Sequence, residues 1–412
     1  MVLILYFDKS RTCWPNGAKL SDVCKPQKPD LSRRASMWHT LSLATRFALP
    51  YPDAIGYVCL ETRNQMRSFL SRRRLLVTAA AGLSVAATPV RPQSLAAREK
   101  YSPSAPVLIE IDARPVPFFD RLDHSHVRFG SLEYRSGLVL TSKFTGFGGL
   151  SGLRLDPKGE QFISFSDKGT WFTGRIVYLG RQMTDLADVE AAPMLGPDGT
   201  PIAAHGWYDT ESIARDGDAV YIGIEGVNQV LRFDFGRDGV RAHGNPITLP
   251  PAVRTLPRTK GLESLVFVPK GLPLAGTLIA ISERGLDPHR NIIGFLIGGS
   301  QPGQFSVRRT DDFDISDAVL LRVGELLVLE RKASLRSGIG IRIRRIALQS
   351  VTPGAVVDGP SIFDADLGQE IDNFEGIDVH VTADGDTVLT LISDDNFSVI
   401  ERTLLLQFTL IK

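Results

Sequence analysis

Acidic residues recur at matching positions along this chain, and their spacing is the first sign of chemistry. Each copy of the pattern opens with a Glu or Ser, a small residue and a branched apolar one, and ends one short strand later on a second acid. The clearest copies supply the pairs Glu211 and Glu225, Glu263 and Glu283, and Glu375 and Asp394. The copies begin roughly 50 to 60 residues apart, which is typical of a repeat architecture. Rotational stacking of such units would bring the acids together around one axis.

A ring of carboxylates repels itself unless cations or protons accompany it. Carboxylate oxygens are also the ligands that Ca²⁺ prefers in proteins. The pattern therefore predicts an acidic channel that binds a hard cation, with calcium as the candidate. The expected metal ligands are Glu211, Glu225, Glu263, Glu283, Glu330, Glu375, Asp394 and Asp395. A structural alternative is open, in which each Glu accepts hydrogen bonds from backbone N–H groups of a neighbouring unit.

Two of the second acids have an arginine directly after them, in Glu283-Arg284 and Glu330-Arg331. Adjacent residues of a strand face opposite ways, so an acid and its own arginine cannot both line one surface. An arginine that reaches the channel would bind a phosphate or carboxylate, whereas the alternative is a salt bridge between units. The run 394–396, Asp-Asp-Asn, is the densest oxygen cluster and suits either a Ca²⁺ site or an ordinary turn.

Other residue types offer less. His124 and His126 would share a strand face, but no acid or cysteine stands near them at metal-site spacing. Ser151 stands in Gly-Leu-Ser-Gly-Leu, which departs from the Gly-x-Ser-x-Gly pattern of a serine hydrolase. The chain has three cysteines, all within residues 1–65. Serine, thiolate and Cys–Zn chemistry are therefore not expected after that segment.

The elements that position the acids are short strands. From about residue 97, runs rich in Val, Ile, Leu and Phe alternate with Asp-Gly turns, the pattern of an all-β sandwich, barrel or propeller. Six units of roughly 53 residues would fill 97–412, so we expect a single β-propeller with six blades, the first around 127–142. The last strand, 404–411, should pair with an N-terminal strand near 107–111 and so close the ring. The alternative to a propeller is a pair of β-sandwich domains. We also expect residues 182–207 to form a loop over the acidic face.

The first hundred residues differ from the rest. Residues 67–76 form a twin-arginine pattern, followed by an apolar run of about 13 residues that fits a secretory signal but is too short to span a bilayer. Because Met66 directly precedes this pattern, we expect 1–65 to be a non-native N-terminal extension, 66–96 a signal peptide, and 97–412 the folded domain. Export by the twin-arginine route to the periplasm or exterior follows. The composition, with 43% hydrophobic residues and a net charge of +1, gives no reason to expect nucleic acid as a partner.

The set of motifs in order resembles the bacterial phytase-like proteins described as "esterase-like activity of phytase". It comprises Gly-Leu-Ser-Gly-Leu at 149–153, Asp-Thr-Glu-Ser-Ile at 209–213, Gly-Leu-Glu-Ser-Leu at 261–265, Leu-Glu-Arg at 329–331 and Asn-Phe-Glu-Gly-Ile at 373–377. The resemblance covers about 130–410 and implies kinship with β-propeller phytases, which use Ca²⁺ in an acidic channel to hydrolyse phosphomonoesters. It implies that Glu211, Glu263 and Glu375 are metal or water ligands, and that Arg284 and Arg331 contact phosphate. Dense Asp, Lys and Tyr clustering of a phytase face is not evident.

Two functions follow as hypotheses. The first is an exported metal-dependent hydrolase of phosphate or other esters, with Glu211, Glu263 and Glu375 as catalytic residues and Arg284 and Arg331 as substrate-binding residues. The second is a non-catalytic propeller that binds a ligand or protein in the cell envelope. In the first, the partner is a small-molecule ester or phosphate, and the mature protein is a monomer without a membrane span.

Overall fold

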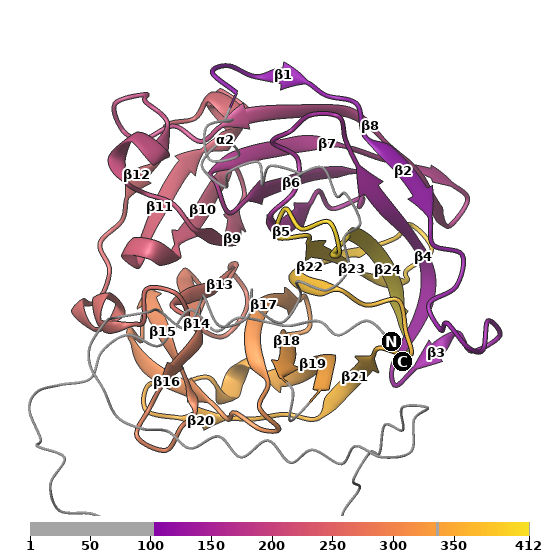
Figure 1. The fold of residues 1–412 in the computed structure, drawn as a ribbon. Helices are drawn as coiled ribbons and strands as arrows, with labels where there is room; N and C mark the ends of the chain where they lie inside the picture. Colours follow the sequence, from indigo (N-terminus) through magenta and orange to yellow (C-terminus); the bar gives the residue numbers. More distant parts are fainter. Residues whose placement is uncertain (1–102, 335–337, 412) are drawn as a thin grey trace, which may run out of the picture. The chain divides into compact units, whose positions relative to one another are not determined.

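The computed structural model describes residues 103–334 and 338–411, and this part of the chain forms five β-sheets (Figure 1). The expectations for 1–65 and 66–96 lie outside the described residues. Within the described residues, no helix has the length and apolar character to cross a membrane.

Each sheet is a blade of a propeller, numbered here in chain order and described from its innermost strand outward. Blade 1 contains β5 (Leu150–Leu155), β6 (Gln161–Ser166), β7 (Thr170–Leu179), β8 (Gln182–Pro193) and β1 (Val107–Leu108). Blade 2 contains β9 (Thr210–Asp216), β10 (Ala219–Ile224), β11 (Gln229–Asp234) and β12 (Asn245–Pro246). Blade 3 contains β13 (Leu262–Phe267), β14 (Thr277–Leu286), β15 (Ile292–Gly298), β16 (Gly303–Val307) and β20 (Val356–Val357).

Blade 4 contains β17 (Asp314–Leu321), β18 (Glu325–Ser334), β19 (Gly338–Ala347) and β21 (Ser361–Asp366). Blade 5 contains β22 (Asn373–Val381), β23 (Thr387–Asp394), β24 (Thr403–Leu410), β4 (Leu132–Thr141) and β2 (Asp112–Pro115), and β3 (Arg128–Phe129) also pairs with β4. Short helical turns occur at η1 (Ile202–His205), η2 (Glu225–Val227), α2 (Phe235–Asp238), η3 (Gly239–Arg241), η4 (Pro251–Thr255) and η5 (Leu348–Ser350).

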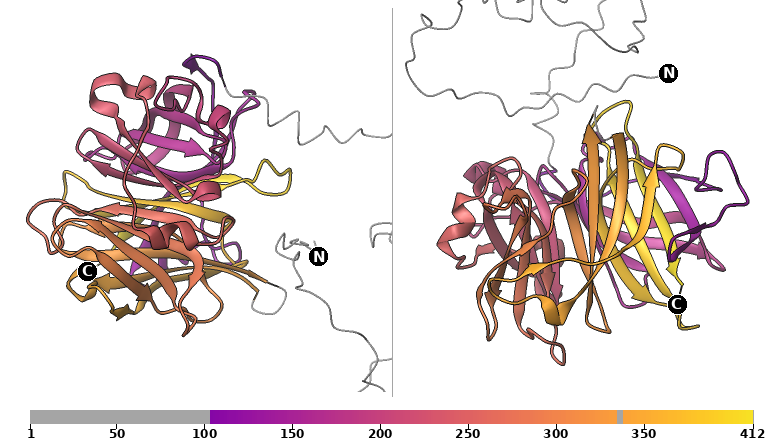
Figure 2. Two further views of the ribbon diagram at one scale, coloured as in Figure 1. Left: turned by 90° about the vertical axis from the view of Figure 1, so that its left-hand side faces the viewer. Right: turned by 90° about the horizontal axis from the view of Figure 1, so that it is seen from below.

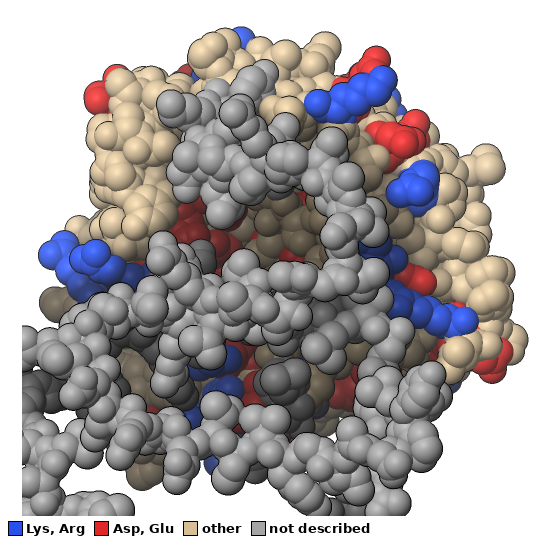
Figure 3. Space-filling view, viewed as in Figure 1, with Lys and Arg blue, Asp and Glu red and all other residues tan. Residues whose placement is uncertain are grey.

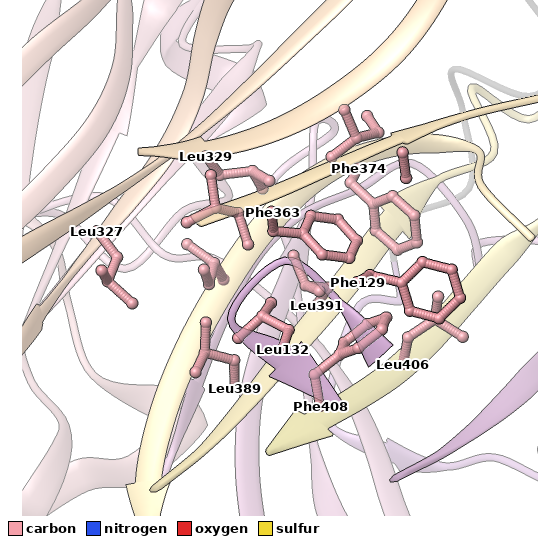
Figure 4. Packing of buried hydrophobic residues seen from close by; sticks show 14 of the residues in the cluster. Phe129, Leu132, Leu327, Leu329, Phe363, Phe374, Leu389, Leu391, Leu406 and Phe408 are labelled. Carbon is pink, nitrogen blue, oxygen red and sulfur yellow. The ribbon is translucent and has the colours of Figure 1, made fainter. Parts of the chain in front are cut away.

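The five innermost strands surround a central axis. Contacts join β5 to β9, β9 to β13, β13 to β17, β17 to β22, and β22 to β5. Five apolar clusters fill the spaces between neighbouring blades. Figure 4 shows the one between blades 4 and 5, where Leu327 and Leu329 of β18 pack with Phe374 of β22 and Phe408 of β24. Figure 2 shows the sheets standing beside one another from two further directions.

The prediction of six blades is wrong, because the N-terminal strands build no blade of their own. The last unit of the chain supplies only three strands, β22 to β24, and β4 extends that sheet by pairing with β24 from Leu132↔Leu410 to Leu140↔Thr403. Residues 127–142 thus belong to blade 5. The last strand does pair with an N-terminal strand, but that strand is β4, whereas 107–108 pairs with β8 at the outer edge of blade 1.

Asp-Gly turns join strands as predicted, with Gly217 at φ 57° and Gly385 at φ 87°, the left-handed region that glycine adopts without strain. The expectation of a loop over 182–207 is wrong for its first half. Residues 182–193 form β8, which pairs along β7, and its side chains Met183 and Val189 are buried.

Candidate metal centre

Every innermost strand carries a β-bulge at the same place near its start. In blade 1, Leu150 pairs with Ser166 and Gly152 with Phe165, which leaves Ser151 as the extra residue. The other four sheets show the same register shift. The residues at the bulges, in blade order, are Ser151, Glu211, Glu263, Ser316 and Glu375. Since a bulge leaves one residue outside the ladder and redirects its side chain, the repeated motif is the sequence signature of this bulge.

The second acids of the repeats also occupy equivalent positions in their blades. Each pairs with the residue that lies two positions before the bulge residue of the innermost strand. The backbone N–H of Asp167 donates to the carbonyl of Gly149 at 2.8 Å, and that of Glu225 donates to Asp209 at 2.7 Å. In blades 4 and 5 the ladder pairs Asp314 with Arg331 and Asn373 with Asp394. The five equivalent residues are therefore Asp167, Glu225, Glu283, Arg331 and Asp394. Blade 4 thus places a cation where the other four blades place an acid.

Three carboxylates meet closely enough to share one metal ion. Oxygen atoms of Glu225, Glu263 and Glu283 all lie within 4.8 Å of one another, and the three side chains are buried. Oxygen ligands at such a separation can converge on a cation 2.3–2.6 Å from each. A buried group of this kind fits a hard cation, and histidine takes no part in it within the described residues.

These three glutamates belong to a larger group of acids that interact electrostatically. We call this group the acidic cluster, and its members are Asp167, Asp209, Glu211, Glu225, Glu263, Glu283, Glu375 and Asp394. Figure 3 shows acidic side chains at the centre of the ring with basic side chains near them.

Burial and mutual repulsion disfavour the charged forms of six of these acids. Burial raises the pKa of Glu225 to about 8, and the carboxylate of Asp209 adds to this shift. Burial raises the pKa of Asp167 to about 7 against the opposing effect of Lys168. The pKa values of Glu211 and Glu263 lie well above the ordinary value, first because of burial and then because of neighbouring carboxylates. Without a cation, these shifts favour the protonated forms of the acids that show them.

Two basic side chains reach into the cluster. Arg331 donates from Nη1 to Glu375 Oε1 at 2.5 Å and from Nη2 to Glu263 Oε1 at 3.2 Å. Lys260 donates from Nζ to both oxygens of Glu283, at 3.0 and 3.1 Å. These two cations neutralise part of the cluster and leave it strongly acidic. Arg331 thus contacts the acids themselves, as the salt-bridge alternative expected.

The structural alternative for the glutamates applies to one of them. Glu225 Oε1 accepts a hydrogen bond from the backbone N–H of Gly261 at 2.6 Å, which links blade 2 to blade 3. The hydrogen bonds of Glu263 and Glu375 come from the side chains of Arg331 and Asn373. Glu211 makes no hydrogen bond through its carboxylate to another described residue. Capping therefore accounts for Glu225 and not for the three bulge glutamates.

The neighbouring acids Asp394 and Asp395 have different roles, one in the acidic cluster and one in a turn. Asp394 is buried, accepts a hydrogen bond from Asn396 N at 2.6 Å, and has a pKa well above the ordinary value because of burial and the nearby Glu375 and Asp167. Asp395 accepts hydrogen bonds from Gly149 N at 3.0 Å and Phe397 N at 2.9 Å. Asp394 thus joins the acidic cluster, while Asp395 shapes the turn and ties it to blade 1.

Two of the expected site residues have other partners. Glu330 is fully buried between Arg342 and Arg344, with Nε–O distances of 2.7 and 2.9 Å. It pairs with Ile315 one position before Arg331, so its side chain lies on the opposite face of β18. Arg284 binds Asp314, with Nε to Oδ2 at 2.7 Å, on the side of β14 away from Glu283. Neither residue is brought into the acidic cluster.

A buried arginine spans the interior below the cluster. Arg154 of β5 makes a bidentate pair with Asp317 of β17, at 3.0 and 3.2 Å, and donates to the carbonyls of Leu265 on β13 and Ile377 on β22. Four of the five innermost strands are thereby joined by one side chain. Sequence reasoning missed this network, since nothing in the spacing of Arg154 and Asp317 marks them as partners.

Sequence reasoning also missed three members of the site. Asp167 and Asp209 stand at motif positions equivalent to Glu225 and Gly261, so an alignment of the repeats by their bulges would have found them. Lys260 lies directly before the motif at 261–265 and carries no repeat signal of its own.

A side pocket of about 360 Å³ opens beside the cluster between blades 3, 4 and 5. Its basic lining residues are Arg121, Lys260, Arg284, Arg331, Lys332 and Arg402. Its acidic lining residues are Glu283, Asp314, Asp372 and Glu401. Glu283 of the acidic cluster lines the pocket, as do Lys260 and Arg331, which bind acids of the cluster. The side pocket and the acidic cluster therefore share one wall, and a ligand in the pocket would touch the cluster.

The sequence matches the model of one known protein family over more than half of its length. Residues 145–397 match the family model "Phytase-like: Esterase-like activity of phytase", and no curated protein sequence matches the chain. Among solved structures, Myxococcus xanthus glutaminyl cyclase is 12% identical, with a TM-score of 0.35 over 64% of this chain and 92% of that one. PQQ-bound aldose sugar dehydrogenase from Streptomyces coelicolor is 11% identical, with a TM-score of 0.34 over 73% and 98%. Similarities this low carry no functional argument.

Proposed function

Because the chain belongs to this phytase-like family, we propose that it is a metal-dependent hydrolase of phosphate or other esters, with its active site at the acidic cluster. The observation that carries the proposal is the convergence of Glu225, Glu263 and Glu283 within 4.8 Å. Buried acids at this density, with Arg331 and Lys260 as the basic side chains among them, require further positive charge to ionise together.

Calcium is the proposed ion, since the donors are carboxylates only. Glu225, Glu263 and Glu283 would hold it, with Glu375 and Asp394 as further oxygen ligands in the same cluster. Bound Ca²⁺ would neutralise a substrate anion and favour ionisation of a water ligand.

Glu211 is the proposed general base. Glu263 and Glu375 are tied to Arg331, whereas the half-buried Glu211 carboxylate has no hydrogen-bond partner among the described residues. Burial and the carboxylates of Glu375 and Glu263 raise its pKa, which makes it a stronger proton acceptor than an exposed glutamate. Arg331 and Lys260 would hold the substrate anion from the wall shared with the side pocket.

The test is hydrolysis of p-nitrophenyl phosphate and p-nitrophenyl acetate by the purified protein, with CaCl₂ and with EGTA. We expect Ca²⁺-dependent turnover, and a fall in kcat of about 10² to 10⁴ for Glu211→Gln. Glu160→Gln, an exposed residue in the β5–β6 turn, is the matched control and should be unchanged. Equal rates in EGTA, or no turnover of either ester by metal-loaded protein, would refute the hydrolase proposal.

A non-catalytic ligand-binding propeller is the second candidate, and Arg331 favours it. This arginine takes the place of an acid in the repeat and bridges Glu263 and Glu375. Such a site would bind an anionic ligand by exchange with its own carboxylates. Ligand binding without turnover in the same assays would support this candidate.

We also propose export by the twin-arginine route, from the pattern at 67–76. Cell fractionation of the full chain and of an Arg72→Lys, Arg73→Lys variant tests it. The variant should accumulate in the cytoplasm, and equal distribution of the two proteins would contradict export.

A further inference from the structure

The side pocket is lined by apolar as well as charged residues, and the apolar residues are called its apolar wall. This wall consists of Ala333, Ile339, Ile341, Leu367, Ile371 and Ile400. Ile341 and Ile371 are buried and belong to the apolar cluster between blades 4 and 5. Leu367 and Ile400 stand on the β21–β22 and β23–β24 connections and are 55% and 63% exposed. The pocket therefore continues from the core surface to an apolar rim.

The charged wall offers little surplus positive charge. Arg402 binds Glu370 at 2.7 Å and Asp372 at 3.2 Å, and Arg121 binds Glu370 at 3.1 Å. Arg284 binds Asp314. A polyphosphorylated ligand would have to compete with each of these carboxylates, next to the acidic cluster. A single anionic group has to displace only the carboxylates that pair with Arg331 and Lys260 at the wall shared with the cluster.

Building on the proposed function, we propose that the substrate is an amphiphilic ester with one anionic group and one apolar arm. The anionic group would lie at Arg331 and Lys260, and the arm would lie along Ile341, Ile371 and the rim residues Leu367 and Ile400. A volume of about 360 Å³ suits a small ligand of this kind. Each methylene group that the apolar wall removes from water should tighten binding about fourfold.

The experiment is isothermal titration calorimetry of the full-length protein with Ca²⁺, using inorganic phosphate, hexyl phosphate and myo-inositol hexakisphosphate as probes. We expect hexyl phosphate to bind at least tenfold more tightly than inorganic phosphate and more tightly than the hexakisphosphate. A hexakisphosphate that binds more tightly than hexyl phosphate, or equal affinities for phosphate and hexyl phosphate, would overturn the inference.

Variants at the exposed rim keep the test clear of folding defects. Leu367→Ser and Ile400→Ser should each weaken hexyl phosphate binding severalfold and leave phosphate binding unchanged. Val399→Ser is the matched control, since Val399 is 95% exposed beside Ile400 and does not line the pocket. Equal losses in Ile400→Ser and Val399→Ser would also overturn the inference.

The binding readout separates this inference from the proposed function. Selective binding of hexyl phosphate without hydrolysis of any ester would support the proposed class of ligand and refute the proposed hydrolase activity. Ca²⁺-dependent hydrolysis without a preference for the alkyl arm would support the proposed hydrolase activity and refute the proposed class of ligand.

Discussion

Arg331 Nη1 donates to Glu375 Oε1 at 2.5 Å, although the two residues come from adjacent blades and Arg331 occupies a position that is acidic in the other four. The same guanidinium reaches Glu263 of blade 3. One arginine thus holds together two carboxylates that a metal ion would otherwise have to bring together. We therefore expect Arg331 to compete with the proposed Ca²⁺ ion for these carboxylates.

Replacing Arg331 with Ser should therefore have opposite effects on the apo and metal-bound protein. Without metal, the loss of a largely buried partner should lower the free energy of unfolding by about 3 kcal/mol. With Ca²⁺, affinity should rise about tenfold or more, because the carboxylates no longer exchange an arginine for the ion. Calorimetric titration and melting curves measure both. Arg237→Ser, at an exposed pair, is the control, and unchanged Ca²⁺ affinity in Arg331→Ser would reject the competition.

The stability of the metal-free protein should fall between about pH 4 and pH 8. Burial raises the pKa of Asp167 from 3.8 to about 7 and that of Glu225 from 4.5 to about 8. The folded state then binds more protons than the unfolded state across this window, so the free energy of unfolding decreases as the pH rises. Urea unfolding in EGTA at pH 5 and pH 8 measures it. A free energy that increases over this interval would show that the acids are not buried together.

Arg154 should contribute strongly to the stability of the innermost strands that it joins. Arg154→Met leaves Asp317 buried without its partner and should cost about 3 to 5 kcal/mol. The double variant Arg154→Met, Asp317→Asn should cost less than the sum of the two single changes, because the unpaired charge is gone. Arg175→Ser, at an exposed pair with Asp188, should cost no more than about 1 kcal/mol. Additive single and double effects would mean that the two residues do not act as a pair.

The C-terminal strand should be needed for a stable blade 5. Deleting 403–412 removes β24 from between β23 and β4, which exposes the hydrogen-bonding edges of both. We expect unfolding or aggregation, measured by melting and light scattering. A truncated protein with unchanged melting temperature and solubility would contradict this role.

Local patterns predicted the all-β class, the Asp-Gly turns and most of the acidic cluster, because the motif and its bulge lie within one strand pair. The number of blades depended on pairing between β24 and β4, whose residues lie far apart in the chain. The sequence predicted Glu330 as the site residue of blade 4, but the residue at the equivalent position is Arg331, one residue later. The repeat aligns Glu330 with Ser282 and Ser393, so Arg331 takes the position of the acid. The reach of Arg154 across the channel leaves no trace in sequence spacing.

Paired melting curves test most directly whether Glu225, Glu263 and Glu283 bind Ca²⁺. For the wild-type protein, the melting temperature should be higher in Ca²⁺ than in EGTA. At a Ca²⁺ concentration of 100 times the dissociation constant, the expected stabilisation is about 2.7 kcal/mol. Glu263→Gln should lose this increment and melt in EGTA at least as high as wild type, because one repelling carboxylate is gone. If Ca²⁺ leaves wild-type melting unchanged, and Glu263→Gln is destabilised by about 1–3 kcal/mol in EGTA, the cluster is a structural network and the metal site is refuted.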